Sequence, residues 1–364
     1  QLLCIKLNIK KQKSNLYKMI AKKFIENLDL WLNQNTPLKI EIVSLVKFET
    51  GQSNPTFIIK SDEKNYVLRS KPKGNLLKGA HRIDREYKVM NSLKNSQIPV
   101  PKMYGYCGDA EVIGSEFYIM EFVEGNHEID PFLKYYNNLQ KEKIYDHKID
   151  ILTEWASVDI KQLGLEEFGR PLGYLERQIN LWISQYRASQ TKEIESMEFL
   201  IENIPKFIPK EIDDLPPSLL HGDFRLDNMI LTKDKTLNKI AGLLDWELST
   251  LAPPFIDLSY WALMLRFKKE WPIGGLGNNR NMKQNSGIPS ENMILEKYLN
   301  KTGFDKPKYW KYLLAFNSFR FAGILQGIAK RLIDGNNAAD NAYQVGEQAE
   351  PVAKLGSELL KESL

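Results

Sequence analysis

The sequence predicts an α+β protein of two lobes, in which a β-rich N-lobe with one inserted helix precedes a mainly helical C-lobe. The length of 364 residues fits two domains, or one domain of two lobes. Within residues 38–123, short runs of alternating apolar and β-branched residues are typical of strands. After Gly125, apolar residues recur at helical spacing instead. We therefore expect an N-lobe over residues 19–123 and a C-lobe over residues 124–364.

The N-lobe is expected to begin with a short helix over residues 19–33, where Ile20, Phe24 and Leu28 recur at a spacing of four. A mostly antiparallel sheet follows this helix. Its strands are expected at residues 38–48, 56–60, 66–69 and 117–123, and its inserted helix at residues 80–93. The polar residues 61–65 (SDEKN) join two of these strands as a hairpin.

The C-lobe is expected to consist largely of helices. Helical periodicity dominates residues 131–163, 174–204, 255–269, 290–301 and 308–334. Residues 218–250 differ, because two apolar runs flank a polar segment there, which indicates a strand, a loop and a second strand. Residues 272–289 are rich in Gly, Asn and Pro, so we expect an exposed loop.

Charge and composition exclude several classes of protein. Residues 1–30 carry seven Lys against two acids, a charge of +5, so the remaining residues carry about −1 of the net charge of +4 and are close to neutral. A near-neutral body argues against a nucleic-acid-binding surface. Two cysteines are too few for a disulfide framework and fit a reducing compartment. No apolar run reaches the roughly 18 residues of a membrane span.

Residues 1–18 are rich in Lys and Asn and contain no acid. We expect a disordered basic extension there, since terminal segments are commonly unstructured. A transit peptide is the alternative, although such peptides favour Arg and Ser. The expected location is intracellular and cytoplasmic, with mitochondria and peroxisomes as alternatives. The final Glu-Ser-Leu differs from the peroxisomal Ser-Lys-Leu address, and the sequence does not indicate an oligomeric state.

Two segments of the C-lobe carry polar groups suited to chemistry. Residues 219–231 (LLHGDFRLDNMIL) place His, Arg, Asn and two Asp between apolar runs, and residues 241–247 (AGLLDWE) end an apolar run with a carboxylate. Phosphoryl transfer to a hydroxyl group needs such residues. Asp223 is the candidate base that accepts the hydroxyl proton. Asn228 and Asp245 offer the oxygen ligands that Mg²⁺ binds together with phosphate oxygens and water.

The order H-x-D-x-x-x-x-N followed by D resembles the paired signature of the aminoglycoside phosphotransferase and choline kinase-like family, and protein kinases share this order. The stretches GQSNPTFII, HRIDREYKVM, VIGSEFYIMEFVEG and GLLDWELSTLAPPFIDLSYW are similar to one branch, the kinase-like domain fused ahead of acyl-CoA dehydrogenases. The resemblance spans about residues 20–340. It implies a protein-kinase-like fold, ATP and Mg²⁺ as cofactors, and a hydroxylated fatty acid or hydroxyacyl-CoA as acceptor.

The resemblance also implies a charged pair in the N-lobe. Arg69 in YVLR stands where kinases place the Lys that pairs with the phosphates, and Arg keeps the charge of Lys but not its geometry. Glu86, in the inserted helix, is the expected partner of Arg69.

A turn and a strand of the N-lobe are further candidates for nucleotide binding. Ser53 and Asn54 lie in the polar turn GQSN, where the family has its phosphate-covering loop, and a plain hairpin turn is the alternative. Glu121 and Val123 lie in MEFV, which resembles the hinge strand whose backbone pairs with adenine.

The resemblance implies roles around the polar loop of the C-lobe as well. Arg225 stands where protein kinases carry a Lys that faces the γ-phosphate, and an ion pair with Asp227 is the alternative. His221 is expected to brace the loop by hydrogen bonds rather than to touch substrate. Asp257 either caps the helix that begins beside it or bonds the backbone of this loop.

Helix 316–334 is expected to have one core face and one polar face. The core face is formed by Phe321, Ile324, Leu325, Ile328 and Leu332. Gly323 and Gly327 on the other face suggest close packing or room for a ligand, since Gly lowers helix stability. Arg320 is a candidate for binding a substrate carboxylate or a CoA phosphate, with a surface ion pair as the alternative. Trp246 and Glu247 either face the acceptor pocket or pack beneath it.

The leading hypothesis is a Mg²⁺- and ATP-dependent kinase whose ligands are a nucleotide and a small-molecule alcohol. The same reaction on choline, ethanolamine or an aminoglycoside is an alternative; acids would line an aminoglycoside site and aromatic residues a choline site. A nucleotide-binding pseudokinase is another, although the expected catalytic and metal-binding residues are present. A metallohydrolase would need a richer His and Asp set than four His provide.

Overall fold

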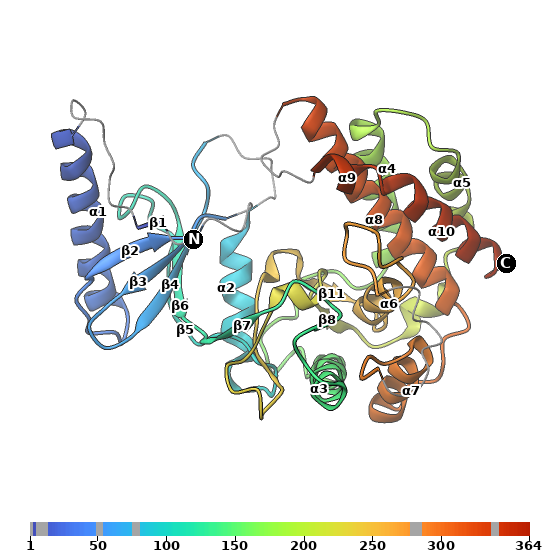
Figure 1. Cartoon of the computed structure of the whole chain (residues 1–364), viewed down its shortest axis with the longest axis horizontal. Coiled ribbons are helices and arrows are strands. Elements are labelled where there is room, and N and C mark those ends of the chain that lie inside the picture. Colours follow the sequence, from blue (N-terminus) through green and yellow to red (C-terminus); the bar gives the residue numbers. More distant parts are fainter. Residues whose placement is uncertain (1–2, 5–13, 49–53, 75–80, 277–285, 336–341) are drawn as a thin grey trace. The chain divides into compact units, whose positions relative to one another are not determined.

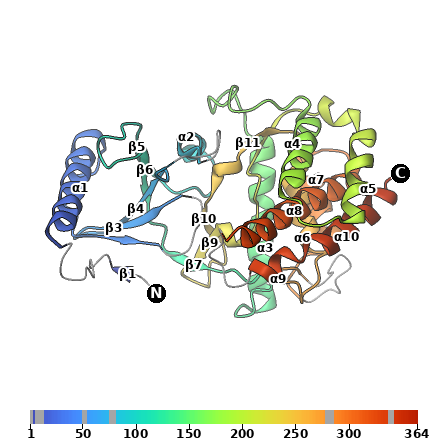
Figure 2. The ribbon, with the colours of Figure 1, turned by 90° about the horizontal axis from the view of Figure 1, so that it is seen from above.

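The chain forms two compact units, whose elements are labelled in Figures 1 and 2. The computed structural model describes residues 3–4, 14–48, 54–74, 81–276, 286–335 and 342–364, with side chains described from residue 22 onward. The first unit comprises Gln1–Glu124 and Ala241–Ser249, and the second comprises Gly125–Ile240 and Thr250–Leu364. We expected the segment Ala241–Ser249 in the C-lobe, but it belongs to the first unit.

A six-stranded antiparallel sheet forms the first unit, in the order β1-β2-β3-β4-β6-β5. Its strands are β1 (Leu3–Cys4), β2 (Ser44–Lys47), β3 (Thr56–Lys60), β4 (Asn65–Ser70), β5 (Met103–Cys107) and β6 (Phe117–Glu121). β3 and β4 form the hairpin expected around residues 61–65, with Ile58 opposite Val67. The inserted helix is α2 (Ile83–Ser92).

The run expected as a strand over residues 38–48 is a strand only at Ser44–Lys47. Leu38 and Ile42 alternate into the core before the chain reaches the segment that pairs with β3. Alternation of apolar and polar residues along a sequence indicates that one face of an extended segment is buried. A strand also needs a neighbouring strand for its backbone hydrogen bonds, and the alternation does not predict whether such a neighbour is present.

β5 is a strand that the sequence pattern does not predict, because Gly105 interrupts it. A Cβ atom at Gly105 would lie 2.9 Å from Cγ2 of Thr36 and 3.1 Å from the ring of Trp31. Glycine is therefore required where this strand passes the helix α1 (Ser14–Asn35).

Helix α1 begins inside residues 1–18, which were expected to be disordered. The physical reason is visible in the sequence: Leu16 extends the four-residue spacing of Ile20 and Phe24 toward the N-terminus.

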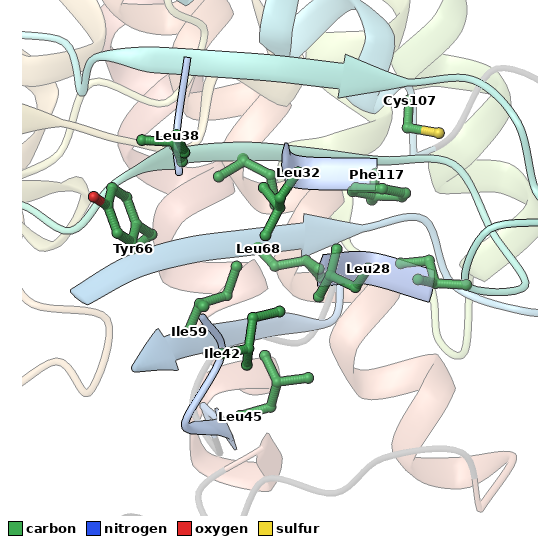
Figure 3. Packing of buried hydrophobic residues seen from close by; sticks show 12 residues of the cluster. Leu28, Leu32, Leu38, Ile42, Leu45, Ile59, Tyr66, Leu68, Cys107 and Phe117 are labelled. Atoms are coloured by element: carbon green, nitrogen blue, oxygen red, sulfur yellow. The ribbon is translucent and has the colours of Figure 1, made fainter. Parts of the chain in front are cut away.

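The core of the first unit lies between α1 and one face of the sheet (Figure 3). Leu28 and Leu32 of α1 are fully buried there with Leu68 of β4 and Phe117 of β6. Tyr118 follows Phe117 and faces the opposite side, where its ring lies 6.2 Å from that of Tyr87 in α2. The sheet therefore carries α1 on one face and presents the other face to α2.

The segment Ala241–Ser249 returns to the first unit through backbone and side-chain contacts. It contains the end of β10 (Ile240–Leu243) and the short 3₁₀ helix η5 (Trp246–Leu248). The N–H of Leu243 donates to the C=O of Pro99 at 2.6 Å. Trp246 is fully buried, and its Nε1 donates to the C=O of Leu243 at 3.0 Å. Trp246 therefore packs beneath the turn that contains Asp245.

The second unit is mainly helical. Its helices are α3 (Asn138–Ser157), α4 (Tyr174–Ser189), α5 (Glu195–Asn203), α6 (Ile256–Met264), α7 (Glu291–Thr302), α8 (Trp310–Ile333), α9 (Ala342–Gly346) and α10 (Ala349–Lys361). Two antiparallel pairs accompany them, β7 (Gly125–His127) with β9 (Met229–Thr232), and β8 (Ser218–Leu220) with β11 (Thr250–Ala252). Residues 174–204, where helical periodicity was expected, form the two helices α4 and α5, and α10 was not predicted.

Helix α8 is enclosed by other helices over its first two thirds, because α4, α6 and α10 all pack against it. The expected two-faced pattern is therefore wrong for this part. Arg320 and Gly323 of the expected polar face are buried, whereas Ile328 of the expected core face is only half-buried. A Cβ at Gly323 would lie 3.2 Å from the Trp182 ring, so this glycine serves close packing against α4.

None of the described helices combines the length and the apolar character needed to cross a membrane.

Candidate active-site residues

In the first unit, Arg69 lies between two carboxylates. It projects from β4, and its Nε donates to Glu86 Oε2 in α2 at 3.0 Å, while its Nη2 donates to Asp245 Oδ1 at 2.8 Å. Burial lowers the pKa of Arg69, but Glu86 and Asp245 outweigh it and the net direction is upward. Burial raises the pKa of Glu86 to about 7 against the opposing effect of Arg69. The expected partners thus meet, and Asp245 joins them.

Asp245 is the most exposed member of this group, with 33% of its side chain accessible. Its backbone is left-handed, with φ of 63° and ψ of 58°, immediately before η5. A non-glycine residue is uncommon in this region, and such strain is found most often at functional sites. The turn presents a carboxylate that Arg69 orients and that solvent can still reach.

Asn54 is buried rather than open to solvent, with 3% exposure. Its Nδ2 donates to Glu247 Oε2 at 3.4 Å, and its Oδ1 lies 3.0 Å from Nδ1 of His81. Asn54 therefore links the start of β3 to the residue that follows Trp246. Ser53, the other candidate in this turn, lies outside the described residues.

At the expected hinge, the backbone N–H of Glu121 donates to the C=O of Lys102 at 2.8 Å. The Glu121 side chain accepts from the N–H of Lys102 at 3.2 Å. The side chain of Val123 lies against Gly242, where a Cβ would be 3.2 Å from it. Glu121 is thus tied to its neighbouring segment, and pairing of this backbone with adenine stays a prediction.

In the second unit, the polar loop after β8 holds the Asp223 carboxylate by two donors. The hydroxyl of Tyr260 in α6 donates to Oδ1 at 2.8 Å, and Nδ2 of Asn228 donates to Oδ2 at 3.0 Å. Asn228 Nδ2 also donates to the backbone C=O of Asp223 at 2.9 Å. Burial raises the pKa of Asp223, but Arg225 and Tyr260 together lower it by more, so the net shift of this pKa is downward.

Two buried charged residues brace the backbone of this loop. Asp257 in α6 accepts from the N–H of His221 at 2.7 Å and from the N–H of Gly222 at 3.0 Å. Arg320 in α8 donates from Nη2 to the C=O of Gly222 at 2.5 Å. His221 contributes as well, since its Nδ1 accepts from the N–H of Asp223 at 3.2 Å. Asp257 thus bonds the loop, and the surface ion pair considered for Arg320 is wrong because the side chain is buried.

Arg225 pairs with Asp227, the alternative to a phosphate contact. Its Nε also lies 3.5 Å from Asp223 Oδ1. These carboxylates raise the pKa of Arg225 against the effect of burial. The side chain is a third exposed, so the guanidinium is shared between two carboxylates at the edge of the loop.

Two residues near this loop were not found by sequence reasoning. Tyr260 follows Asp257 by three residues, which places both on one face of α6, and that spacing is the signal that could have found it. Lys148 of α3 is buried, with its Nζ 4.8 Å from the centre of the Phe224 ring and 4.4 Å from that of Trp261. Burial lowers the pKa of Lys148 to about 7.

The Arg69–Glu86 pair joins a strand and an inserted helix in the place of the kinase Lys–Glu pair. Together with the H-x-D-x-x-x-x-N loop of the helical unit, it is typical of the protein-kinase-like phosphotransferases. Comparison with known families agrees with this class. The chain belongs to the phosphotransferase enzyme family, because the model of that family matches residues 44–278. It is therefore a transferase of the kinase type, which moves a phosphoryl group to a hydroxyl.

Individual relatives support the same fold and family. A Ralstonia eutropha protein, provisionally named an aminoglycoside phosphotransferase, has a solved structure that is 37% identical, with a TM-score of 0.84 over 93% of this chain and 98% of its own. The rat acyl-CoA dehydrogenase family member 11 is 34% identical over 93% of this chain and 44% of its own length. The mouse acyl-CoA dehydrogenase family member 10 is 38% identical over 86% and 29%. The chain thus spans less than half the length of these two curated relatives.

Proposed function

We propose that this phosphotransferase is a Mg²⁺- and ATP-dependent kinase whose acceptor is a hydroxylated fatty acid or its CoA thioester. The observation that carries the proposal is the carboxylate of Asp223, which accepts hydrogen bonds from Tyr260 and Asn228. Donors to both oxygens favour the ionised form and fix its orientation. An oriented carboxylate at the start of this loop is suited to accept a proton from an alcohol.

In the proposed reaction, the hydroxyl oxygen of the acceptor forms a bond to the γ-phosphorus of ATP. The bond from that phosphorus to the bridging oxygen breaks, and ADP leaves with the electron pair. The hydroxyl proton passes to the carboxylate of Asp223. Asp257 and Arg320 do not take part in these steps, because they bond the backbone of the loop and hold Asp223 in place.

Arg69 and Asp245 support a nucleotide site in the first unit. A guanidinium that is already held by Glu86 offers a fixed positive charge to phosphate oxygens. Mg²⁺ neutralises charge on the β- and γ-phosphates when it is bound. In this proposal its protein ligands are the Asp245 carboxylate and the amide oxygen of Asn228, a donor set that suits Mg²⁺. Asp245 belongs to the first unit and Asn228 to the second. The proposal that both are Mg²⁺ ligands is based on the order of their two sequence motifs.

The chemistry of the relatives supports the acceptor class. Both curated relatives bear names of acyl-CoA dehydrogenase family members, and the chain matches less than half of each. A phosphotransferase segment in proteins named for acyl-CoA substrates points to an acyl molecule that bears a hydroxyl group. Choline, ethanolamine and aminoglycosides are the competing acceptors.

The test measures ADP release with Mg²⁺ and ATP against 4-hydroxy fatty acids, their CoA thioesters, choline, ethanolamine and an aminoglycoside. The corresponding acids without the hydroxyl group report background ATP hydrolysis. We expect turnover with the hydroxyacyl compounds alone. Turnover with choline or an aminoglycoside only would replace the acceptor class, and Mg²⁺·ATP binding without turnover of any alcohol would indicate a pseudokinase.

A further inference from the structure

The buried hydrogen-bond donors of the second unit that lack an acceptor among the described residues include Nη1 of Arg320 and the indole Nε1 of Trp182. These two donors come from adjacent helices, because α4 and α8 pack side by side (Figure 1). The guanidinium carbon of Arg320 lies 5.8 Å from the centre of the Trp182 ring. Buried donors are almost always satisfied in folded proteins, so each orphan donor needs an explanation.

Charge makes the need stronger for Arg320. Its side chain is only 5% exposed, and within the described part of the chain it forms no ion pair. Its Nη2 reaches a neutral carbonyl, that of Gly222, and the rings of Trp182 and Tyr260 lie beside the guanidinium. The Asp223 and Asp257 carboxylates interact with its charge electrostatically without accepting a hydrogen bond from Nη1. Aromatic faces compensate a buried cation in part. An anionic oxygen would satisfy Nη1 with a charge-assisted hydrogen bond.

The position of this pair relates it to the acceptor. Gly222, which Arg320 binds, is the residue before Asp223. Tyr260, whose ring lies 5.4 Å from the Arg320 guanidinium, donates to the Asp223 carboxylate. The orphan donors therefore lie close to the group that would take the hydroxyl proton. An acceptor whose hydroxyl lies at Asp223 would therefore have a second polar group within reach of these donors.

We propose that Arg320 Nη1 and Trp182 Nε1 form a subsite for a carboxylate of the acceptor, so that the preferred acceptor is a hydroxy acid with a free carboxylate. The inference rests on the proposed kinase function and specifies its substrate. A buried cation beside the base also disfavours polycationic acceptors such as aminoglycosides. Trp182 acts here as a specificity residue, and Arg320 both binds the carboxylate and positions the loop.

The test compares a 4-hydroxy fatty acid with its methyl ester in the Trp182→Phe variant. Phenylalanine keeps an aromatic ring over the guanidinium but removes the N–H group. We expect KM for the acid to rise about tenfold, as for the loss of one hydrogen bond to a charged group, with kcat and KM for ATP unchanged. KM for the ester should change less than twofold.

Trp310→Phe is the matched control, because its Nε1 is satisfied by Glu291 at 3.0 Å. It should leave the ratio of the KM values for acid and ester as in the wild type. Arg320→Lys keeps the charge and provides a second variant; it should lower kcat for both acceptors and raise KM further for the acid. Thermal melting of each variant confirms that it is folded.

Calorimetric binding of the hydroxy acid in the absence of ATP separates this proposal from the kinase function. Tenfold weaker binding in Trp182→Phe supports the subsite even if no acceptor is turned over. Equal binding in the variant and the wild type overturns it and assigns the donors to buried water. Absence of binding to the wild-type protein also overturns it. Turnover of the acid and ester with equal KM values leaves the kinase function intact and removes the subsite.

Discussion

The charged residues of the first unit and those of the second are stabilised in different ways. Around Arg69, charge meets charge, because two carboxylates contact one guanidinium. Around Asp223, the neutral groups of Tyr260 and Asn228 donate the short hydrogen bonds to the two carboxylate oxygens, and the Arg225 guanidinium lies farther away, with its Nε 3.5 Å from Oδ1. A residue that binds phosphate must keep its charge, and ion pairing ensures this. A base must be able to accept a proton, and neutral donors orient it without fixing its charge as firmly.

The largest effect is expected at Asp223, the proposed base. Asp223→Asn removes the proton acceptor but keeps the size of the side chain, so kcat should fall by about 10²- to 10⁴-fold. Affinity for Mg²⁺·ATP should change little. Asp227→Asn is the matched control in the same loop, since the Asp227 carboxylate pairs with Arg225 and is not the proposed base. Steady-state kinetics with a hydroxy acid would measure both variants, and a control that lost as much activity as Asp223→Asn would contradict the assignment.

The two units also differ in how they surround a buried cation. Arg69 is paired with carboxylates, whereas Lys148 contacts the rings of Phe224 and Trp261. The pKa of Lys148 is about 7 in the folded chain against an ordinary value of 10.5. Between these values the unfolded chain binds more protons, so the stability of the wild type should rise with pH. The penalty for the buried charge is fully present below pH 7 and fades toward pH 10.5.

Lys148→Met should therefore stabilise the fold by a few kcal/mol at pH 6, and by less as the pH rises. Denaturant unfolding of both proteins at pH 6, 8 and 9.5 measures the difference. Lys297→Met is the control, because Lys297 forms a partly exposed ion pair with Asp146 and should change stability by no more than about 1 kcal/mol at any pH. A Lys148→Met variant that is less stable than the wild type at pH 6 would show that the ammonium group is favourably bound.

A third prediction concerns the exposed member of the first cluster. Asp245→Asn removes the charge that Arg69 orients and the proposed metal ligand, so affinity for Mg²⁺·ATP should fall roughly 10- to 100-fold. Affinity for ATP without Mg²⁺ should change less. Glu247→Gln is the matched control in the same turn, and fluorescence titration with and without Mg²⁺ compares the two. Equal Mg²⁺ dependence in Asp245→Asn and the wild type would remove Asp245 from the metal site.

Much of the fold could be predicted because its signals are local. The β3–β4 hairpin follows from two alternating runs around a polar turn, and the pairing of Arg69 with Glu86 follows from the resemblance of their two segments to kinases. Contacts that bring distant segments together left no such signal. Arg320 reaches Gly222 across 98 positions, and Tyr260 reaches Asp223 across 37. Arg320 and Asn54 look like surface residues in the sequence, and only packing shows that they are buried.

The smallest expected effect belongs to Tyr260, and it shows whether neutral donors matter at the base. Tyr260→Phe removes the hydroxyl that donates to Asp223 and keeps the ring, which lies 5.4 Å from the Arg320 guanidinium and 6.2 Å from the Phe321 ring. Asn228 still holds the other oxygen of Asp223. We expect kcat to fall about tenfold, in line with the loss of one hydrogen bond to a charged group, while KM for ATP stays the same.

Tyr312→Phe is the control, because its hydroxyl is also buried in the second unit but donates to the C=O of Ile204. Both variants should lose similar stability in thermal melting, since each loses one hydrogen bond. Only Tyr260→Phe should lose kcat, because only its hydroxyl contacts the proposed base. If the two variants kept wild-type kcat, then Asn228 alone would suffice to orient Asp223, and the contrast between the two units would rest on the paired charges of the first unit alone.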